Sequence, residues 1–205
     1  MPEGDRRPLR RVVLASGNPG KQREFAALLA GLGIELLLQS ALGVTSIEET
    51  GTSFEANALL KARHAARCAG LPALADDSGL EVDALAGRPG VHSARYAGPT
   101  ASDADNNARL LAELAGVAPP ARTARYRCVL ALVRGSADPE PLLARGVWEG
   151  RIATAAAGHN GFGYDPLFIP QGMTLHAAQL ESTLKNRLSH RGQAAAELVR
   201  QLERR

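Results

Sequence analysis

The sequence is poor in aromatic residues, lysine and cysteine, and it contains no long apolar run. Its 205 residues include eight Phe, Trp and Tyr in total, three lysines and two cysteines. No stretch approaches the roughly 18 consecutive apolar residues of a membrane-spanning helix, so the sequence predicts no membrane partner. The segment Met1–Arg7 lacks the apolar core of a secretory signal, and residues 1–10 are therefore expected to form a flexible N-terminal extension.

Cysteine usage and charge narrow the class of protein only a little. Cys68 and Cys128 lack the spacing of metal ligands and are expected to be buried, reduced thiols of a cytoplasmic protein. The net charge of +3 suits an anionic small molecule as well as nucleic acid, so it does not separate these two kinds of ligand. Among the 24 basic residues only Lys21, Lys61 and Lys185 are lysines, which marks these positions as ones that need a compact ammonium group.

Short apolar or alternating segments are interspersed with helical patterns along the chain. Strands are predicted at Arg11–Ala15, Ile34–Gln39, Ala73–Asp76, Arg125–Arg134 and Pro141–Ile152. Helices are predicted at Lys21–Ala30, Thr52–Ala69 (with Thr52 and Glu55 in capping-box spacing), Ser102–Leu114 and Ser189–Leu202. Strands alternate with helices at first, and two longer strands then follow each other like a hairpin. The pattern predicts an α/β fold with a mixed, partly antiparallel sheet, as one domain or two closely joined lobes.

A small-residue loop between the first strand and the first helix is typical of an anion site. The apolar run Val12–Ala15 leads directly into Ser16, Gly17, Asn18, Pro19, Gly20 and Lys21. Backbone N–H groups at a helix start, two glycines and one ammonium group favour phosphate as the ligand. The loop is not the common phosphate loop, because Ala15 and Gln22 stand where that motif needs glycine and a hydroxyl residue.

Two pairs of acidic residues are candidates for a metal or base role. Asp76-Asp77 directly follows the apolar Leu74-Ala75, at the predicted end of a strand, and Glu48-Glu49 precedes the second predicted helix. Carboxylate oxygens suit Mg²⁺, which also takes oxygens from substrate phosphates and water. An ordinary turn and a solvated pair beside a helix are the alternative interpretations. Within the second helix, Asn57 and Lys61 share one face at i, i+4 spacing and could line the same site.

Three of the eight aromatic residues lie within Gly161–Phe168. The glycines that flank Phe162 permit its ring to lie against a planar ligand, and stacking of a base on such a ring contributes about 1–3 kcal/mol. For Tyr164 and Phe168 we favour the other interpretation, in which the rings complete the hydrophobic core.

A basic cluster, Lys185–Gly192, precedes the last predicted helix. Ser189 is a good N-cap, which places His190 and Arg191 in the first turn, where positive charge opposes the helix dipole. This placement indicates a ligand contact, and donors at Lys185, His190 and Arg191 would suit the keto oxygens of a purine. A solvated basic turn is the alternative.

In their order and spacing these segments resemble the inosine triphosphate pyrophosphatase family, from about Arg11 to the C-terminus. The segments that carry the resemblance are Ser16–Lys21, Glu48–Gly51, Phe54–Ala58, Ala75–Leu80, Ser93–Tyr96, Gly161–Pro166 and Ser189–Gly192. Enzymes of this family hydrolyse ITP, dITP and XTP to the monophosphate and pyrophosphate. The resemblance implies a single domain over residues 11–205, with an elongated mixed sheet flanked by helices and two lobes around an active-site cleft.

The resemblance also implies a role for each motif. Ser16, Gly17, Asn18, Pro19, Gly20 and Lys21 would bind the triphosphate, and Ser78 would contact the substrate. Glu49 and Asp77 would hold Mg²⁺, and Asp77 would accept the proton of the attacking water. The base would be held by Phe162, Gly163, Tyr164, Asp165, Lys185, His190 and Arg191. The expected partners are a purine nucleoside triphosphate and a second copy of the chain in a homodimer, without a nucleic acid polymer.

One departure and two alternatives accompany the resemblance. The segment Glu181–Leu184 replaces residues that are often acidic in the family, which affects the local helix geometry but not the chemistry. A Maf-type nucleotide pyrophosphatase is an alternative, although such proteins normally carry arginine at the position of Lys21 and lack the late Ser-His-Arg sequence. A non-catalytic binder of nucleotides or nucleic acid is the other, and it predicts a basic stripe and salt-dependent binding.

Overall fold

The computed structural model describes residues 9–204 and contains five α-helices and six β-strands in that range. The strands are β1 (Arg11–Leu14), β2 (Glu35–Leu38), β3 (Ala73–Val82), β4 (Thr123–Val133), β5 (Leu142–Ile152) and β6 (Phe168–Pro170). The helices are α1 (Pro19–Leu29), α2 (Phe54–Ala69), α3 (Asp103–Glu113), α4 (Ser182–Leu188) and α5 (His190–Glu203). Short 3-10 helices lie at Ala30–Leu32, Gln39–Leu42, Asp83–Leu85, Gly90–Arg95, Pro119–Ala121 and Ala177–Gln179.

The strands form one mixed sheet in the order β2-β1-β3-β4-β5-β6. Strand β1 runs parallel to both β2 and β3, whereas β6 runs antiparallel to β5. The predicted α/β fold with a mixed sheet flanked by helices is thereby confirmed. The short strand β6 and the helix α4 have no counterpart among the predicted elements.

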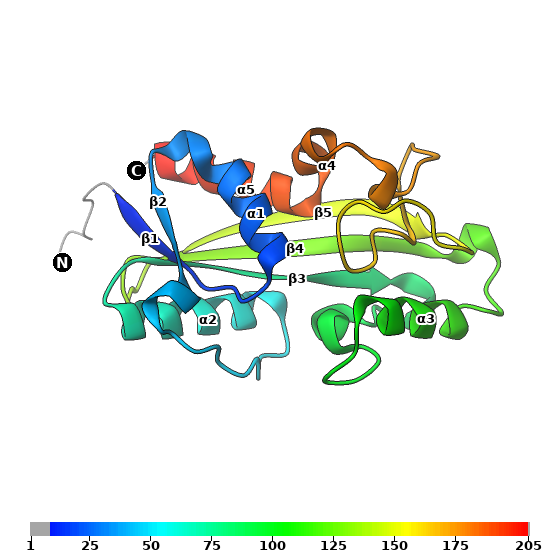
Figure 1. The fold of residues 1–205 in the computed structure, drawn as a ribbon, viewed down its shortest axis with the longest axis horizontal. Helices are drawn as coiled ribbons and strands as arrows, with labels where there is room; N and C mark the ends of the chain where they lie inside the picture. Colours follow the sequence, from blue (N-terminus) through cyan, green and yellow to red (C-terminus); the bar gives the residue numbers. More distant parts are fainter. Residues whose placement is uncertain (1–8, 205) are drawn as a thin grey trace. The chain divides into compact units, whose positions relative to one another are not determined.

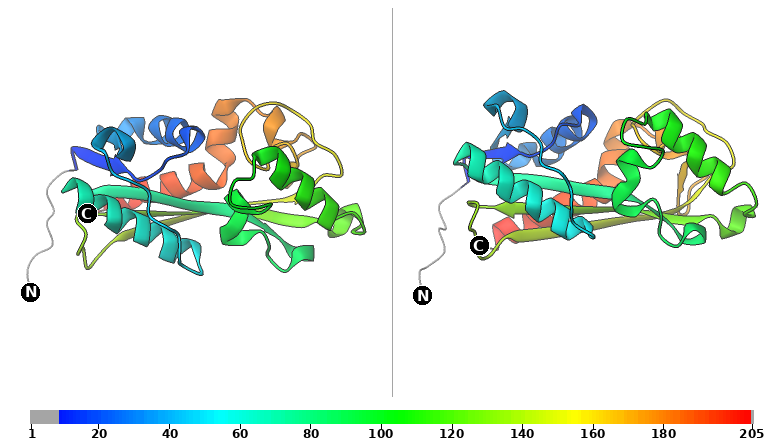
Figure 2. Two further views of the ribbon diagram at one scale, coloured as in Figure 1. Left: turned by 60° about the horizontal axis from the view of Figure 1, so that its bottom comes forward. Right: turned by 90° about the horizontal axis from the view of Figure 1, so that it is seen from below.

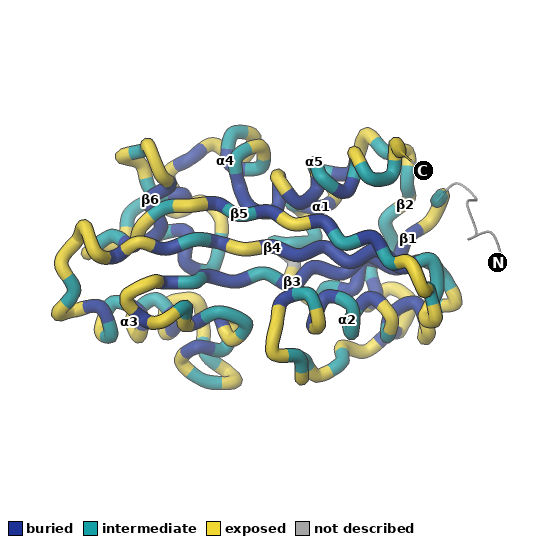
Figure 3. The backbone as a smooth tube through the Cα atoms, turned by 180° about the vertical axis from the view of Figure 1, so that it is seen from behind, coloured by how far each residue is buried: buried dark blue, intermediate teal, exposed yellow. Residues whose placement is uncertain are grey.

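The chain divides into two compact units, each with its own hydrophobic core. The first unit comprises the described residues of Met1–Asp77, Cys128–Gly146 and Gln193–Arg205, and the second comprises Ser78–Arg127 and Val147–Gly192. Strands β3, β4 and β5 contribute residues to both units. Buried residues run along β3 and β4, as the dark blue tube in Figure 3 shows.

In the first unit, helices cover both faces of the parallel strands. Helices α1 and α5 lie on one side and α2 lies on the other (Figure 1), which Figure 2 shows from two further angles. Strand β1 ends at Leu14, which is in register with Leu74 of β3, and β3 continues beyond that point. Strand β2, which follows β1 in the chain, lies on one side of β1, and β3 lies on the other. The strand order therefore reverses at β1. Ligands of open α/β sheets bind at such switch points, outside the carboxyl ends of the strands.

In the second unit, aromatic rings from two long strands form the centre of the core. Tyr126 of β4 and Trp148 of β5 both pack against Phe168 of β6, with ring centroids 4.7 and 5.3 Å away. The Tyr164 ring is also buried, and its hydroxyl donates to the carbonyl oxygen of Ser93 at 2.8 Å. The interpretation of Tyr164 and Phe168 as core residues is confirmed.

Three local predictions are wrong. Asp76 and Asp77 do not stand at a strand end, because β3 continues through Ser78 to Val82. The N-cap of α2 is Ser53 and not Thr52, since the Ser53 hydroxyl accepts the backbone N–H of Ala56. Cys68 is exposed, whereas Cys128 is buried as expected, and both are free thiols.

Most of the predicted extension over residues 1–10 lies outside the described residues, which begin at position 9. Among the helices of residues 9–204, none has the length and apolar character that crossing a membrane requires.

The pairing of β5 with β6 depends on the absence of a side chain at Gly150, which is in register with Pro170. A Cβ atom at this position would overlap the carbonyl oxygen of Ile169 and the ring of Phe168. We expect Gly150→Ala to lower the free energy of unfolding by about 2 kcal/mol, because overpacked cores lose about that much. Gly135→Ala is the matched control, since a Cβ there meets nothing within 4 Å. Chemical denaturation of both variants measures the difference, and equal stabilities would contradict the packing argument.

Candidate active site

The loop between β1 and α1 is held in shape by its own side chains. Asn18 is the N-cap of α1, and its side-chain oxygen accepts the backbone N–H groups of Gly20 and Lys21 at 2.8 and 3.1 Å. The Ser16 hydroxyl accepts the backbone N–H of Asn18, and the Ser16 carbonyl accepts the side-chain amide of Gln22. The helix N-terminus predicted as an anion site is present, and Asn18 caps it in this structure.

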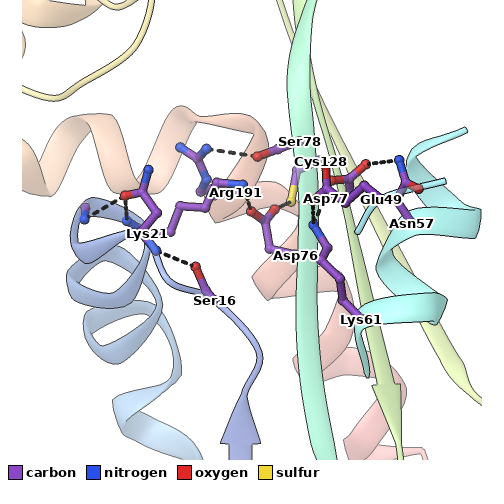
Figure 4. Close-up of polar contacts among 12 residues, drawn as sticks. Ser16, Lys21, Glu49, Asn57, Lys61, Asp76, Asp77, Ser78, Cys128 and Arg191 are labelled. Carbon is purple, nitrogen blue, oxygen red and sulfur yellow. Dashed lines mark hydrogen bonds and ion pairs between the residues drawn. The ribbon is translucent and has the colours of Figure 1, made fainter. Parts of the chain in front are cut away.

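Lys21 reaches from this helix to the buried carboxylate of Asp76. Its Nζ lies 2.5 Å from Asp76 Oδ2, and the Lys21 side chain retains 17% of its surface exposed. The second oxygen of Asp76 accepts the thiol of Cys128 at 3.1 Å. Asp76 therefore fixes the position of the ammonium group at the start of α1 (Figure 4).

Asp77 points to a different set of partners, all from the first unit. Its Oδ1 lies 2.8 Å from Lys61 Nζ, and its Oδ2 accepts the side-chain amide of Asn57 at 3.3 Å. The same Lys61 Nζ lies 2.6 Å from Glu49 Oε1. Asn57 in turn accepts the backbone N–H of Gly51, which ties the segment that follows Glu49 to α2. The prediction that Asn57 and Lys61 line a common site on one face of α2 is consistent with these contacts.

Alternation along β3 explains why neighbouring aspartates have separate partners. Successive side chains of a strand point to opposite faces of the sheet. Asp76 accordingly meets Lys21 of α1, and Asp77 meets Asn57 and Lys61 of α2, which covers the other face. Each of the two aspartates is therefore paired with a different lysine.

Burial and charge shift the protonation equilibria at Asp77 and Lys61. Burial raises the pKa of the Asp77 carboxyl above its usual range, and the Lys61 ammonium offsets only part of this rise. Burial also lowers the pKa of Lys61, but the negative charges of Asp77 and Glu49 outweigh burial and leave the pKa above its ordinary value. The ammonium and the carboxylates thus depend on each other for their charges.

The carboxylates of Glu49 and Asp77 fit the demands of Mg²⁺. One oxygen of each carboxylate lies within hydrogen-bond distance of Lys61 Nζ, so the two carboxylates already converge on a single positive charge. Within residues 9–204, no group of three or more His, Cys, Asp or Glu side chains gathers in a way that could hold a metal ion. Two carboxylates are sufficient for Mg²⁺, because this ion keeps several waters and takes its remaining ligands from phosphates.

The second unit contains a separate cluster around the half-buried ring of Phe162. Lys185 Nζ lies 5.2 Å and the Arg191 guanidinium carbon 4.8 Å from the ring centroid, distances typical of cation–π contacts. Lys185 also forms an ion pair with Asp165 at 2.8 Å, in which each side chain is 5% exposed. Asp165 further accepts the backbone N–H of Phe162 at 3.0 Å. One carboxylate thus holds both the backbone of Phe162 and the ammonium group of Lys185.

The start of α5 supplies the remaining predicted residues of this cluster. The Ser189 hydroxyl accepts the backbone N–H of Gly192, which confirms Ser189 as the N-cap. Arg191 donates to the Ser78 hydroxyl at 2.9 Å. His190 is almost fully buried and its ring stacks on Tyr126, with centroids 4.6 Å apart and planes 8° from parallel.

Gly161 is required by the space around it as well as by its backbone. Its φ of +77° lies in the left-handed region, and an added Cβ would overlap the Asp165 carboxylate and come within 3.0 Å of Lys185 Nζ. The ion pair between Asp165 and Lys185 therefore occupies the space that a side chain at position 161 would take.

The structure divides the predicted residues between its two units, and we call the two sets the first and the second cluster. The first comprises Ser16, Gly17, Asn18, Pro19, Gly20, Lys21, Glu49 and Asp77, of which Glu49 and Asp77 are joined by Lys61 and Lys21 is held by Asp76. The second comprises Ser78, Phe162, Gly163, Tyr164, Asp165, Lys185, His190 and Arg191, of which Phe162, Asp165, Lys185, Arg191 and Ser78 are linked by direct contacts and Tyr164 belongs to the core. Sequence reasoning did not assign the bridge made by Lys61, the support of Lys21 by Asp76 and Cys128, or the stacking of Tyr126 on His190. The scarcity of lysine was a usable signal for Lys61, but nothing local marked Cys128 or Tyr126.

Fold and clusters together define an α/β protein with a capped helix N-terminus and a held lysine beside the switch point of its parallel strands, and with an aromatic ring flanked by two cationic side chains in its second unit. A sequence profile of the Ham1 family matches residues 12–201. The chain belongs to the Ham1 family.

Relatives and solved structures agree with this assignment. The dITP/XTP pyrophosphatase of Methylococcus capsulatus is 60% identical over 193 residues, which cover 94% of this chain and 96% of the relative. A HAM1 protein from Coxiella burnetii has a solved structure with a TM-score of 0.89 and 47% identity, covering 96% of this chain and 100% of that one. A nucleoside-triphosphatase, or dITP/XTP pyrophosphatase, from Mycobacterium abscessus gives a TM-score of 0.73 at 44% identity, covering 92% and 98%.

The bridge made by Lys61 generates a stability prediction that does not require catalysis. Lys61→Ala leaves the carboxylates of Glu49 and Asp77 close together without their shared cation, so we expect the free energy of unfolding to fall by about 3 kcal/mol. Added Mg²⁺ should then raise the melting temperature of the variant more than that of the original chain, because the ion replaces the lost charge. Thermal unfolding with and without Mg²⁺ measures this difference, and an equal or smaller effect of Mg²⁺ on the variant would argue against a cation site at these carboxylates.

Proposed function

We propose that this chain hydrolyses non-standard purine nucleoside triphosphates (ITP, dITP and XTP) to the monophosphate and pyrophosphate, with Mg²⁺ as cofactor. The observation that carries the proposal is the convergence of Glu49 and Asp77 on one cationic point, in the same unit as the ammonium group of Lys21. Relatives that are more than 50% identical over almost the whole chain carry the name dITP/XTP pyrophosphatase, which supports this substrate class. Such an enzyme removes deaminated purines from the nucleotide pool before they enter DNA or RNA.

The first cluster supplies groups for the bond cleavage. When held by Glu49 and Asp77, Mg²⁺ would provide positive charge for the phosphate oxygens and lower the pKa of a nearby water. Asp77 accepts a proton from the attacking water as the water oxygen forms its bond to the α-phosphorus. The bond from the α-phosphorus to the bridging oxygen of the β-phosphate breaks, and pyrophosphate leaves. Lys21, fixed by Asp76, binds phosphate oxygens, and the loop from Ser16 to Gly20 surrounds them.

The second cluster supplies groups for recognition of the base. Phe162 stacks on the purine, and the donors of Lys185, His190 and Arg191 face the acceptor oxygen at purine position 6. Adenine carries an amino donor at that position, so it would leave buried donors without partners, a mismatch that can cost a factor of about 10⁴. Guanine shares the 6-keto oxygen, and its rejection requires a contact at its 2-amino group.

The remaining expectations follow the family resemblance. They are a homodimer, a cytoplasmic location, and a substrate that is a free nucleotide and not a nucleic acid polymer. The alternative of a Maf-type enzyme predicts other preferred nucleotides, and that of a non-catalytic binder predicts no turnover.

One assay separates the proposal from both alternatives. Release of pyrophosphate is measured with and without Mg²⁺ for ITP, dITP, XTP, GTP and ATP. We expect Mg²⁺-dependent release from the first three and far slower release from GTP and ATP. Preference for GTP or ATP, or the absence of turnover, would overturn the proposal.

Substitution of Asp77 tests the assigned proton acceptor and metal ligand. We expect Asp77→Asn to lower kcat for ITP by about 10³-fold or more, since the amide can neither accept the proton nor replace the carboxylate as a ligand. Asp83→Asn changes the same charge at an exposed position and serves as the control. Circular dichroism establishes that both variants fold, and turnover of folded Asp77→Asn near the original rate would rule out both roles.

Substitution of Lys21 tests the phosphate site. Lys21→Ala removes one charge from bound triphosphate, and we expect kcat/KM to fall by about 100-fold, with a large part of the loss in KM. Arg23→Ala removes an equal charge from an exposed position on the same helix and should leave both constants within about twofold. If the two variants have equal kcat/KM values, Lys21 does not bind the phosphates.

A further inference from the structure

Helix α3 carries more acidic groups at its start than its own capping needs. The Ser102 hydroxyl accepts the backbone N–H of Asp105, and the Asp105 carboxylate accepts the backbone N–H of Ser102, which completes a capping box. Asp103 takes no part in this box. Its carboxylate is therefore available for a contact outside the helix.

That contact is the backbone of Gly163, in the loop that follows Phe162. The N–H of Gly163 donates to Asp103 Oδ2 at 2.7 Å. One turn along α3, the side-chain amide of Asn107 donates to the carbonyl oxygen of Gly163 at 2.8 Å and to the carbonyl oxygen of Asp103 at 2.8 Å. Both polar backbone groups of Gly163 are thus held by two residues on one face of α3.

We call the contacts of Asp103 and Asn107 with Gly163 the clamp. The clamp holds a backbone position whose conformation only glycine adopts without strain. Gly163 has a φ of +64°, in the left-handed region, and a Cβ there would meet nothing within 4 Å. The glycine is thus needed for backbone conformation and not for space. Immediately before it, the backbone N–H of Phe162 donates to Asp165. The backbone of Phe162 is consequently fixed on both sides. Asp165 holds its own N–H, and α3 holds the N–H and the carbonyl of the next residue, Gly163.

We propose that Asp103 and Asn107 are positioning residues for base recognition, which hold the Phe162 ring in the orientation that stacks on the purine by clamping the backbone of Gly163. This inference rests on the proposed function, because it assumes that Phe162 receives the base. Neither residue touches the substrate. Their loss loosens the ring and weakens binding of the purine, while the groups that cleave the phosphate bond stay unchanged.

A matched pair of aspartates in the first turn of α3 tests the proposal. Asp103→Ala and Asp105→Ala remove the same charge two residues apart, but only Asp103 contacts Gly163. We expect Asp103→Ala to raise KM for ITP about tenfold with kcat within about twofold, because stacking contributes to binding and not to the chemical step. Asp105→Ala loses the carboxylate half of the capping box and should lower the melting temperature at least as much, without the change in KM.

Two further variants distinguish the proposed positioning role of Asp103 from a general loss of stability. Asp103→Asn keeps a side-chain oxygen that accepts the Gly163 N–H, so KM should return to within about threefold of the original value. Asn107→Ala removes the other half of the clamp and should raise KM in the same direction as Asp103→Ala.

The outcomes separate this inference from the proposed function. Absence of ITP hydrolysis by the original chain would overturn the proposed function. If the original chain is active, equal KM values in Asp103→Ala and Asp105→Ala would overturn the clamp, as would an unchanged KM in Asn107→Ala. A raised KM in the two clamp variants, restored by Asp103→Asn, supports it.

Discussion

Two consecutive buried carboxylates inside a strand are the constraint on which the candidate site depends. A buried charge is tolerated only when it is paired and hydrogen-bonded, so Asp76 and Asp77 of β3 each need partners. Because successive side chains of a strand face opposite sides of the sheet, these partners must come from both layers of helices. Lys21 of α1 and Lys61 of α2 meet this need. The two helices that flank the parallel strands are thereby joined to the strand that carries the carboxylates.

The two compact units contain different kinds of candidate binding groups. The boundary between the two compact units falls between Asp77 and Ser78. Residues up to Asp77 belong to the unit with the carboxylates and Lys21, which suits phosphate and metal chemistry. Ser78 belongs to the unit with Phe162, Lys185 and Arg191, where a third buried ion pair, between Lys185 and Asp165, lies against Phe162. In each unit a buried carboxylate fixes a lysine proposed to meet the ligand, Asp76 for Lys21 and Asp165 for Lys185.

Much of this arrangement could be predicted from the sequence, where the signals are local. The loop that opens α1, the N-cap Ser189 and most strand positions follow from patterns of a few residues. Strand β3 was predicted too short, because Asp-Asp-Ser-Gly is typical of a turn. Its continuation as a strand depends on its place between β1 and β4 in the sheet and on the tertiary partners Lys21, Lys61 and Asn57, none of which is visible locally. The bridge by Lys61 and the contact of Asp103 with Gly163 join residues that are far apart in sequence, and no local pattern marks such pairs.

The proposed function assigns the phosphate groups to Lys21 and the base to Phe162, Lys185 and Arg191. The most direct measurement compares the ratio of kcat/KM for ITP to kcat/KM for ATP in two variants. Lys21→Ala should lower both values and leave the ratio within about threefold of the original. Arg191→Met should reduce the ratio by at least about tenfold, because a donor to the base is lost. An unchanged ratio in Arg191→Met, or a collapsed ratio in Lys21→Ala, would contradict the account.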